Sequence, residues 1–298
     1  SATMILPSGR NLALVAAYLA VTIVMTWPFV NYGALGEASY GSDMSLVVWT
    51  LAWDNHALLA QIPLFDSNLF YPAADSLRYN EHLFGLSLFT LPWSIVGASP
   101  VLAHNITWWL AFPFNGLAAF ALVRRFVTSD LAAFGGSLVY TYSFYVMLHA
   151  GGHLHLIWLW PLPLSLLLLE RWFDVPSVGR AALWAGTVLL QSMTSWYLAV
   201  MIILINALMG AVLTIFPSSE RRATAVENQD LRRIWARRAM HLISAGVVMT
   251  LCLYPFARPY ADITSVPEEI SANAADLASY LVPPQNTIVG RWWFNSVN

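Results

Sequence analysis

Lysine does not occur in this 298-residue chain, and charged residues of any kind are scarce. All 14 basic residues are arginine, and charged residues make up only 10% of the sequence. Hydrophobic residues account for 58%, and the mean hydropathy is +0.60. Soluble globular domains carry about 25% charged residues, so this composition excludes an ordinary soluble domain. It indicates an integral membrane protein, for which we expect membrane lipids and no nucleic acid as partners.

Cysteine is nearly missing too. The single cysteine, Cys252, lies within an apolar run and excludes any intrachain disulfide, so it carries no information about the redox compartment. We expect it to be a small residue packed among apolar neighbours.

Apolar runs suggest an all-α, polytopic membrane protein with about seven transmembrane helices. The block 181–216 would measure about 54 Å as one helix, which is too long for a hydrocarbon core of about 30 Å. We therefore expect it to fold back at "TSWY", residues 194–197. The run 81–97 is apolar but short, and it contains Pro92. The expected spans are 11–30, 101–123, 131–148, 156–172, 180–195, 198–216 and 239–256.

The placement of the arginines decides whether 81–97 also spans. If it does not, 11 of the 14 arginines fall on one side, and Arg78, Arg258 and Arg291 fall on the other. If it does, the basic segment 221–238 would be translocated away from Arg10. The positive-inside rule favours the first arrangement, with 81–97 lying on or dipping into the outer leaflet. The N-terminus is then cytoplasmic, and the first span is retained instead of being removed as a signal peptide.

This topology defines one transmembrane module, 1–298, with two outer loops. The first, 31–100, carries interfacial helices, and the second is 257–298. Ten of the 16 acidic residues and six of the seven histidines fall on the outer side. Any chemistry is therefore expected at the outer face of the membrane. Because the chain stops within the second outer loop, at "GRWWFNSVN", we expect the natural protein to be longer.

The stretch "GSDMSLVVWTLAWDNHALLAQ", residues 41–61, is unusually polar for this chain. On a helix, Asp43, Thr50, Asp54 and Gln61 fall within about 40° of one another, which predicts an interfacial helix with one polar stripe and tryptophans at the headgroup level. Asp43 and Asp54 are 11 residues apart, about 16 Å along the axis, so they cannot act as a pair. Asp43 is either a helix cap or a functional carboxylate, and Asp54 either binds substrate or lies on a solvated face.

Partners for these carboxylates are available in three other segments. The loop 64–85 is rich in polar residues and turn formers, which suits a folded, sugar-sized surface. The motif "HAGGHLHL" places histidines at the outer end of the third span, and an aromatic pair occupies the next outer turn. The expected substrate-binding residues are Asp54, Tyr79, Glu81, His82, His149, His153, His155 and Trp196.

Metal binding by the histidine motif has little support from its spacing. The run H-x3-H-x-H lacks the carboxylate of known zinc helices, so contact with a lipid headgroup or a phosphate is the favoured interpretation. No D-x-D motif follows the first span. A divalent metal cofactor is therefore left as an open possibility that no motif supports. Most of the 14 tryptophans are expected to pack at the membrane interface.

These segments resemble the GT-C superfamily of membrane glycosyltransferases, which includes protein O-mannosyltransferases and oligosaccharyltransferase catalytic subunits. The similarity is carried by "GSDMSLVVWTLAWDNHAL", "PLFDSNLFYPAADSL" and "YVMLHAGGHLHLIWLWPLPLSLLLLER", which are similar to a group of bacterial membrane proteins assigned to that superfamily. It covers nearly the whole chain. The resemblance implies a bacterial cytoplasmic membrane, a polyprenyl-phosphate sugar donor, an outward-facing site at the membrane surface and Asp43 as the catalytic base.

Two other classes of function remain open. A non-catalytic scaffold or assembly subunit would bury its loop acids against partner proteins in a membrane complex. A transporter or flippase would carry ionisable residues at mid-membrane, whereas the span centres hold only polar groups such as Asn115, Gln191 and Asn206. The glycosyltransferase interpretation is preferred, and it predicts an acidic, histidine-containing outer cleft.

Overall fold

The computed structural model describes residues 9–29, 42–216, 231–261, 263 and 291–293, and every regular element among them is a helix. The expected all-α class is therefore confirmed for the described part of the chain. The chain divides into two units, Ser1–Pro259 and Tyr260–Asn298. The first unit carries the helices discussed below. The expected second outer loop, 257–298, lies almost wholly outside the described residues.

Five helical segments of the described chain are long and apolar enough to cross a membrane. They correspond to five of the seven expected spans. α1 (Gly9–Met25) and α10 (Val178–Thr194) correspond to the other two, but with 17 residues each they extend only about 26 Å. The count of seven spans stays a prediction. The five segments are α5 (Pro100–Val123), α6 with α7 (Asp130–Thr141 and Phe144–His149), α8 with α9 (Leu154–Ile157 and Pro161–Asp174), α11 (Trp196–Ile215) and most of α13 (Leu231–Ala257) with η2 (Arg258–Tyr260).

The long apolar block 181–216 folds back where the sequence predicted. α10 ends at Thr194 and α11 begins at Trp196, so Ser195 alone separates them. Its extended backbone, with φ −162° and ψ 136°, interrupts the helix. Two helices of about bilayer thickness replace one that would be too long.

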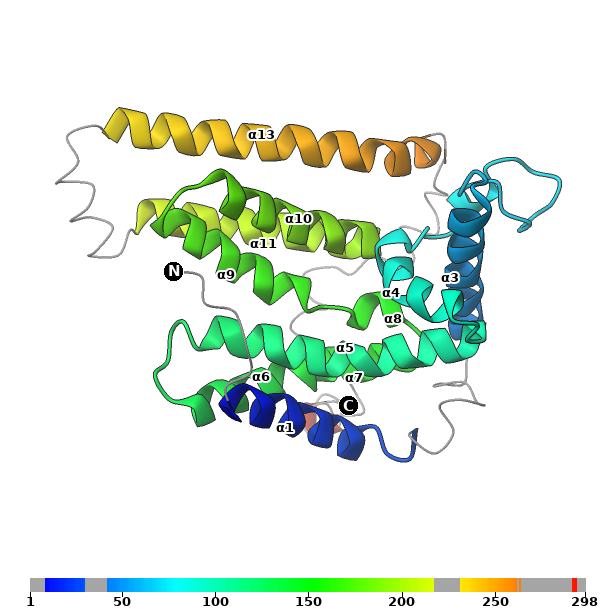
Figure 1. Cartoon of the computed structure of the whole chain (residues 1–298), viewed down its shortest axis with the longest axis horizontal. Helices are drawn as coiled ribbons and strands as arrows, with labels where there is room; N and C mark the ends of the chain where they lie inside the picture. Colours follow the sequence, from blue (N-terminus) through cyan, green and yellow to red (C-terminus); the bar gives the residue numbers. More distant parts are fainter. Residues whose placement is uncertain (1–8, 30–41, 217–230, 262, 264–290, 294–298) are drawn as a thin grey trace. The chain divides into compact units, whose positions relative to one another are not determined.

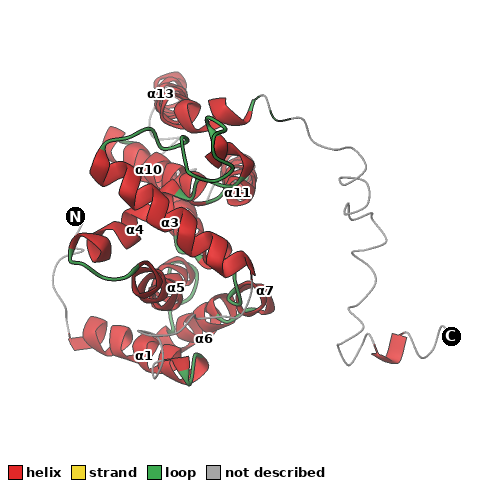
Figure 2. Ribbon diagram, turned by 90° about the vertical axis from the view of Figure 1, so that its right-hand side faces the viewer, coloured by secondary structure: helices red, strands yellow, loops and turns green. Residues whose placement is uncertain are grey.

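α3 (Ser42–Ala60) runs across one end of the bundle formed by α5, α9, α10 and α11 (Figure 1). Figure 2 views the molecule from that end and shows α3 lying across it, with α5 seen along its axis. α4 (Phe84–Ile95) packs against α3, α5 and α10. With 12 residues it extends about 18 Å, too short to cross a bilayer by itself. A short 3-10 helix, η1 (Ser76–Tyr79), precedes it.

Polar side chains at the span centres hydrogen-bond to the backbone where a helix is broken. Between α8 and α9, Asn115 donates to the carbonyl of Ile157 at 2.8 Å and accepts from the N–H of Leu159 at 3.0 Å. Gln191 donates to the carbonyl of Trp158 at 3.1 Å. Hydrocarbon offers no substitute for these bonds, so irregular backbone needs protein partners at this depth. Asn115 and Gln191 are thus accounted for without a transport pathway.

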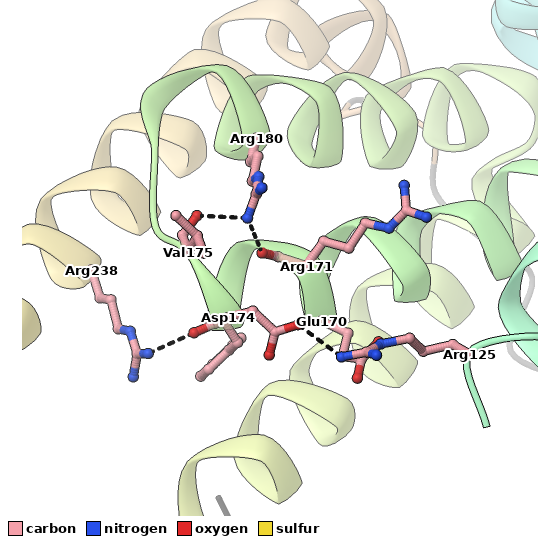
Figure 3. Close-up of polar contacts among 8 residues, drawn as sticks. Arg125, Glu170, Arg171, Asp174, Val175, Arg180 and Arg238 are labelled. Carbon is pink, nitrogen blue, oxygen red and sulfur yellow. Dashed lines mark hydrogen bonds and ion pairs between the residues drawn. The ribbon is translucent and has the colours of Figure 1, made fainter. Parts of the chain in front are cut away.

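Arginines gather around the C-terminal end of α9 (Figure 3), and this end of α9 lies away from α3 in Figure 1. Arg125 pairs with Glu170 at 2.8 Å and with Asp174 at 2.9 Å, both on α9. Arg180 donates to the carbonyl of Arg171 at 2.8 Å, and Arg238 donates to the carbonyl of Phe173 at 2.7 Å. Cations that bind the last carbonyls of a helix also complement its dipole. This gathering agrees with the separation of charge expected from the sequence.

The two ends of α5 should lie on opposite faces of the membrane. We expect Ser45→Cys, on α3, and Thr128→Cys, after α5, to react with a membrane-impermeant maleimide from opposite sides of sealed cells or inverted vesicles. The native Cys252 is first replaced by serine so that only the introduced thiol reacts. Labelling of both positions from the same side would contradict the crossing by α5.

Candidate functional site

Seven of the nine residues selected from the sequence form one row of contacts at the α3 end. Asp43 stands in the first turn of α3, and its Oδ2 lies 3.3 Å from Nε2 of His153. The Asp43 and His153 side chains are 64% and 40% exposed, so a substrate can reach both. Gly152 packs beside this turn, where an added Cβ would lie 3.7 Å from the Cβ of Asp43. The pair is therefore an accessible carboxylate with an imidazole beside it.

Two more histidines continue the row from His153. The rings of His149 and His153 are 5.7 Å apart between centroids, and those of His153 and His155 are 5.8 Å apart. Nδ1 of His149 lies 2.8 Å from the carbonyl of Tyr145, so it donates there and the ring orientation is fixed. The short helices α7 and α8, joined by a glycine-containing turn, bring the three imidazoles together.

Glu81 carries the row from the histidines to the start of α11. Its Oε2 lies 3.4 Å from Nε2 of His155. The carboxylate accepts from the Ser195 hydroxyl at 3.0 Å and from the N–H of Trp196 at 2.6 Å. Burial raises the pKa of the Glu81 carboxyl, and these hydrogen bonds partly offset the shift. Glu81 thus caps the N-terminus of α11, where an acceptor is favoured by the unpaired N–H groups and the helix dipole.

His82 lies in the protein interior and not on a solvent-facing surface. Its ring packs edge-on against Trp196, with centroids 5.5 Å apart, and at a tilt of 43° against Phe256, with centroids 4.9 Å apart. Nδ1 accepts from the N–H of Phe84 at 3.0 Å. Burial lowers the pKa of His82 to about 3, so the ring is neutral at physiological pH. The row therefore ends in the core.

Tyr79 and Asp54 lie outside the row. Tyr79 is exposed on η1, beside the Arg78 guanidinium. Asp54 was expected on a polar stripe facing substrate or solvent, and that placement is wrong, since the side chain is fully buried. Neither carboxyl oxygen of Asp54 has a hydrogen-bond partner, and burial raises the pKa of Asp54 well above its ordinary value.

The burial of Asp54 follows from which face of α3 meets the bundle. Met44, Val47 and Leu51 are buried against the bundle, and Asp54 falls within the same helical stripe. Thr50 is buried as well and accepts from Asn80 at 2.8 Å. The spacing of the apolar residues at 44, 47 and 51 was the signal in the sequence that could have placed Asp54 correctly.

An apolar cavity of about 240 Å³ lies where the end of α3 meets α4 and the end of α13. It begins one helical turn beyond Asp54, at Ala57. Its side chains offer no hydrogen-bonding groups, so it suits a hydrocarbon group and not a sugar. The lining residues are Ala57, Leu58, Ile62, Leu64, Phe65, Phe84, Pro255 and Phe256.

The described residues contain no group of three or more histidine, cysteine or acidic side chains arranged to hold a metal ion. His149, His153 and His155 form a row of rings and do not converge on one point. Comparison of the chain with protein-family models, curated proteins and solved structures gave no match. Asp43 and the three histidines are therefore interpreted from their geometry alone.

The first prediction from the site concerns Asp54. Because its pKa is raised on folding, the folded state binds more protons than the unfolded state at pH values between about 3.9 and the folded pKa. Stability should fall as pH rises through this window. We expect Asp54→Asn to flatten the dependence of Tm on pH, measured from pH 4 to 9 by thermal unfolding in detergent. The exposed Asp75→Asn variant is the control, and parallel curves for Asp54→Asn and wild type would contradict the assignment.

The second prediction concerns the cap on α11. Glu81→Ala leaves the Trp196 N–H and the Ser195 hydroxyl without their acceptor, which typically costs about 1–3 kcal/mol. Glu81→Gln keeps an acceptor oxygen and should lose less. Reversible unfolding in mixed detergent micelles measures both changes. Equal stability of the alanine variant and wild type would show that the cap is not needed.

Proposed function

We propose that this chain is a membrane glycosyltransferase of the GT-C type. It transfers a sugar from a polyprenyl-phosphate donor to an acceptor hydroxyl at the outer face, with Asp43 as the general base. The observation that carries the proposal is the accessible pair of Asp43 and His153. The pair lies at the bundle end opposite the arginines, and the positive-inside rule assigns the arginine end to the cytoplasm.

The topology proposed with it has seven spans and a cytoplasmic N-terminus. α1 and α10 then cross the membrane alongside the five longer segments. Figure 1 supports this arrangement, because both run alongside neighbouring long helices. α3 and α4 belong to an outer loop that folds onto the bundle end.

The chemistry proposed for Asp43 follows from its geometry. An ionised carboxylate can take the proton of an acceptor hydroxyl while that oxygen attacks the sugar C1 and the lipid phosphate leaves from the opposite face, which inverts the configuration. His153 touches one carboxylate oxygen and would hold the side chain in position. His149, beside His153, already donates from Nδ1 to Tyr145, so it would donate from Nε2 to the phosphate only as an imidazolium. Glu81 and His82, although expected to bind substrate, support this surface from within.

A substitution at Asp43 distinguishes its two possible roles, general base and helix cap. Asn caps a helix about as well as Asp but cannot take a proton, so Asp43→Asn should keep the fold and lose roughly 10²-fold or more in turnover. The assay is transfer of a radiolabelled hexose or pentose from polyprenyl phosphate by protein in liposomes. Asp130→Asn, which changes a carboxylate in the first turn of α6 and outside the proposed site, is the matched control.

Near-normal turnover of Asp43→Asn would assign Asp43 to capping. If the wild type transfers no sugar from any donor and instead copurifies stoichiometrically with other membrane proteins, the scaffold alternative replaces the enzyme. The structural roles of Glu81 and His82 are compatible with either function.

A further inference from the structure

The face of α3 turned away from the bundle carries a row of rings. Trp49, Trp53 and His56 follow one another at helical spacing, about half a turn from the buried stripe that contains Met44 and Val47. The indoles of Trp49 and Trp53 are stacked, with centroids 6.4 Å apart and planes at 13°. The ring of His56 follows at 5.7 Å from Trp53. Both indoles are half-buried and His56 is exposed.

The loop 61–80 continues the surface formed by Trp49, Trp53 and His56, and hydrogen bonds attach it to α3. The Trp53 indole N–H donates to the carbonyl of Leu64 at 2.7 Å. Within the loop, the hydroxyls of Ser67 and Ser76 are 2.8 Å apart, and the N–H of Asp75 donates to Asp66 at 3.0 Å. A loop fixed by side-chain bonds can present a binding surface without a large ordering cost.

Three large rings are exposed on this loop. Phe70, Tyr71 and Tyr79 are 63%, 85% and 56% exposed. Phe70 has φ of 57°, a left-handed conformation that is costly for a bulky residue and often marks a functional site. Its ring meets Tyr79 edge-on at 5.8 Å, and the Arg78 guanidinium stands 5.2 Å from the centre of the Tyr79 ring. The Phe70 and Tyr79 rings thus hold each other in place while remaining open to solvent.

The position of these rings argues against burial in lipid. The loop projects past α3 on the side away from the long helices (Figure 1). If those helices cross the membrane, the loop is farther from the bilayer centre than α3. Exposed aromatic clusters in water commonly mark binding surfaces.

We propose that the outer face of α3 and the loop 61–80 bind a carbohydrate chain, which is the acceptor of the glycosyl transfer proposed above. The C–H faces of a sugar pack on aromatic rings, whose faces are electron-rich. Sugar hydroxyls need planar polar partners, and the exposed Asp66 and Asn68 side chains stand on the same loop. α3 is 19 residues long, about 29 Å, and joins the loop to Asp43, so the acceptor is a chain of several sugars and not a monosaccharide.

Binding can be measured without the transfer reaction. Full-length protein in detergent is titrated calorimetrically with maltohexaose, cellohexaose and chitohexaose. We expect at least one to bind, and Trp49→Ala and Tyr71→Ala each to raise its Kd about tenfold or more, whereas Trp49→Phe should lose less. Phe126→Ala, which removes a ring 65% exposed at the arginine end, is the matched control and should leave Kd unchanged.

The outcomes separate this inference from the proposed enzyme. Asp43→Asn should bind the hexasaccharide like wild type while losing transfer. If the wild type binds a hexasaccharide but transfers no sugar, the proposed enzymatic function is contradicted. The proposed carbohydrate-binding surface is then retained. If none of the three hexasaccharides binds, or if Trp49→Ala and Tyr71→Ala bind like wild type, the carbohydrate surface is overturned whether or not transfer occurs.

Discussion

The Glu81 carboxylate holds together the end of the bundle where the functional candidates lie. It comes from the loop between α3 and α4, and it accepts hydrogen bonds from the first residues of α11, which follow it by more than 100 positions. His155 stands against its other side. Because one carboxyl group accepts from the N-terminus of α11 and contacts the histidine row, it connects the loop between α3 and α4 to the turn 194–197.

Polar side chains also satisfy backbone groups where other helices of the bundle are broken. The chain breaks its helices near Trp158 and at Ser195, where both residues are buried, and each break would leave buried backbone groups without partners. Asn115 and Gln191 supply those partners at the first break, and Glu81 supplies them at the second. The few polar side chains of this apolar sequence are used mainly where the backbone needs them.

Asp43 and Asp54 are on the same helix, but their carboxyl groups lie in different environments. Asp43 faces outward beside an imidazole, and Asp54 faces inward with no hydrogen-bond partner for either oxygen. The exposed Asp43 carboxylate can be reached from solvent. A buried one is driven towards its neutral form, because burial penalises the charge. The two carboxyl groups therefore suit different roles.

The sequence by itself determined the membrane character, the helical class, the helix at Ser42–Ala60 and the turn at 194–197. These depend on hydropathy, helix length and local breaks, which are properties of neighbouring residues. It also indicated that the arginines would separate from the histidines, because charge placement follows membrane orientation. Only the tertiary structure decided that Asp54 is buried, that Glu81 caps α11, that His82 lies in the core and that Asp43 meets His153. Each of these depends on which distant segment packs against the residue, and packing partners are not encoded in local spacing.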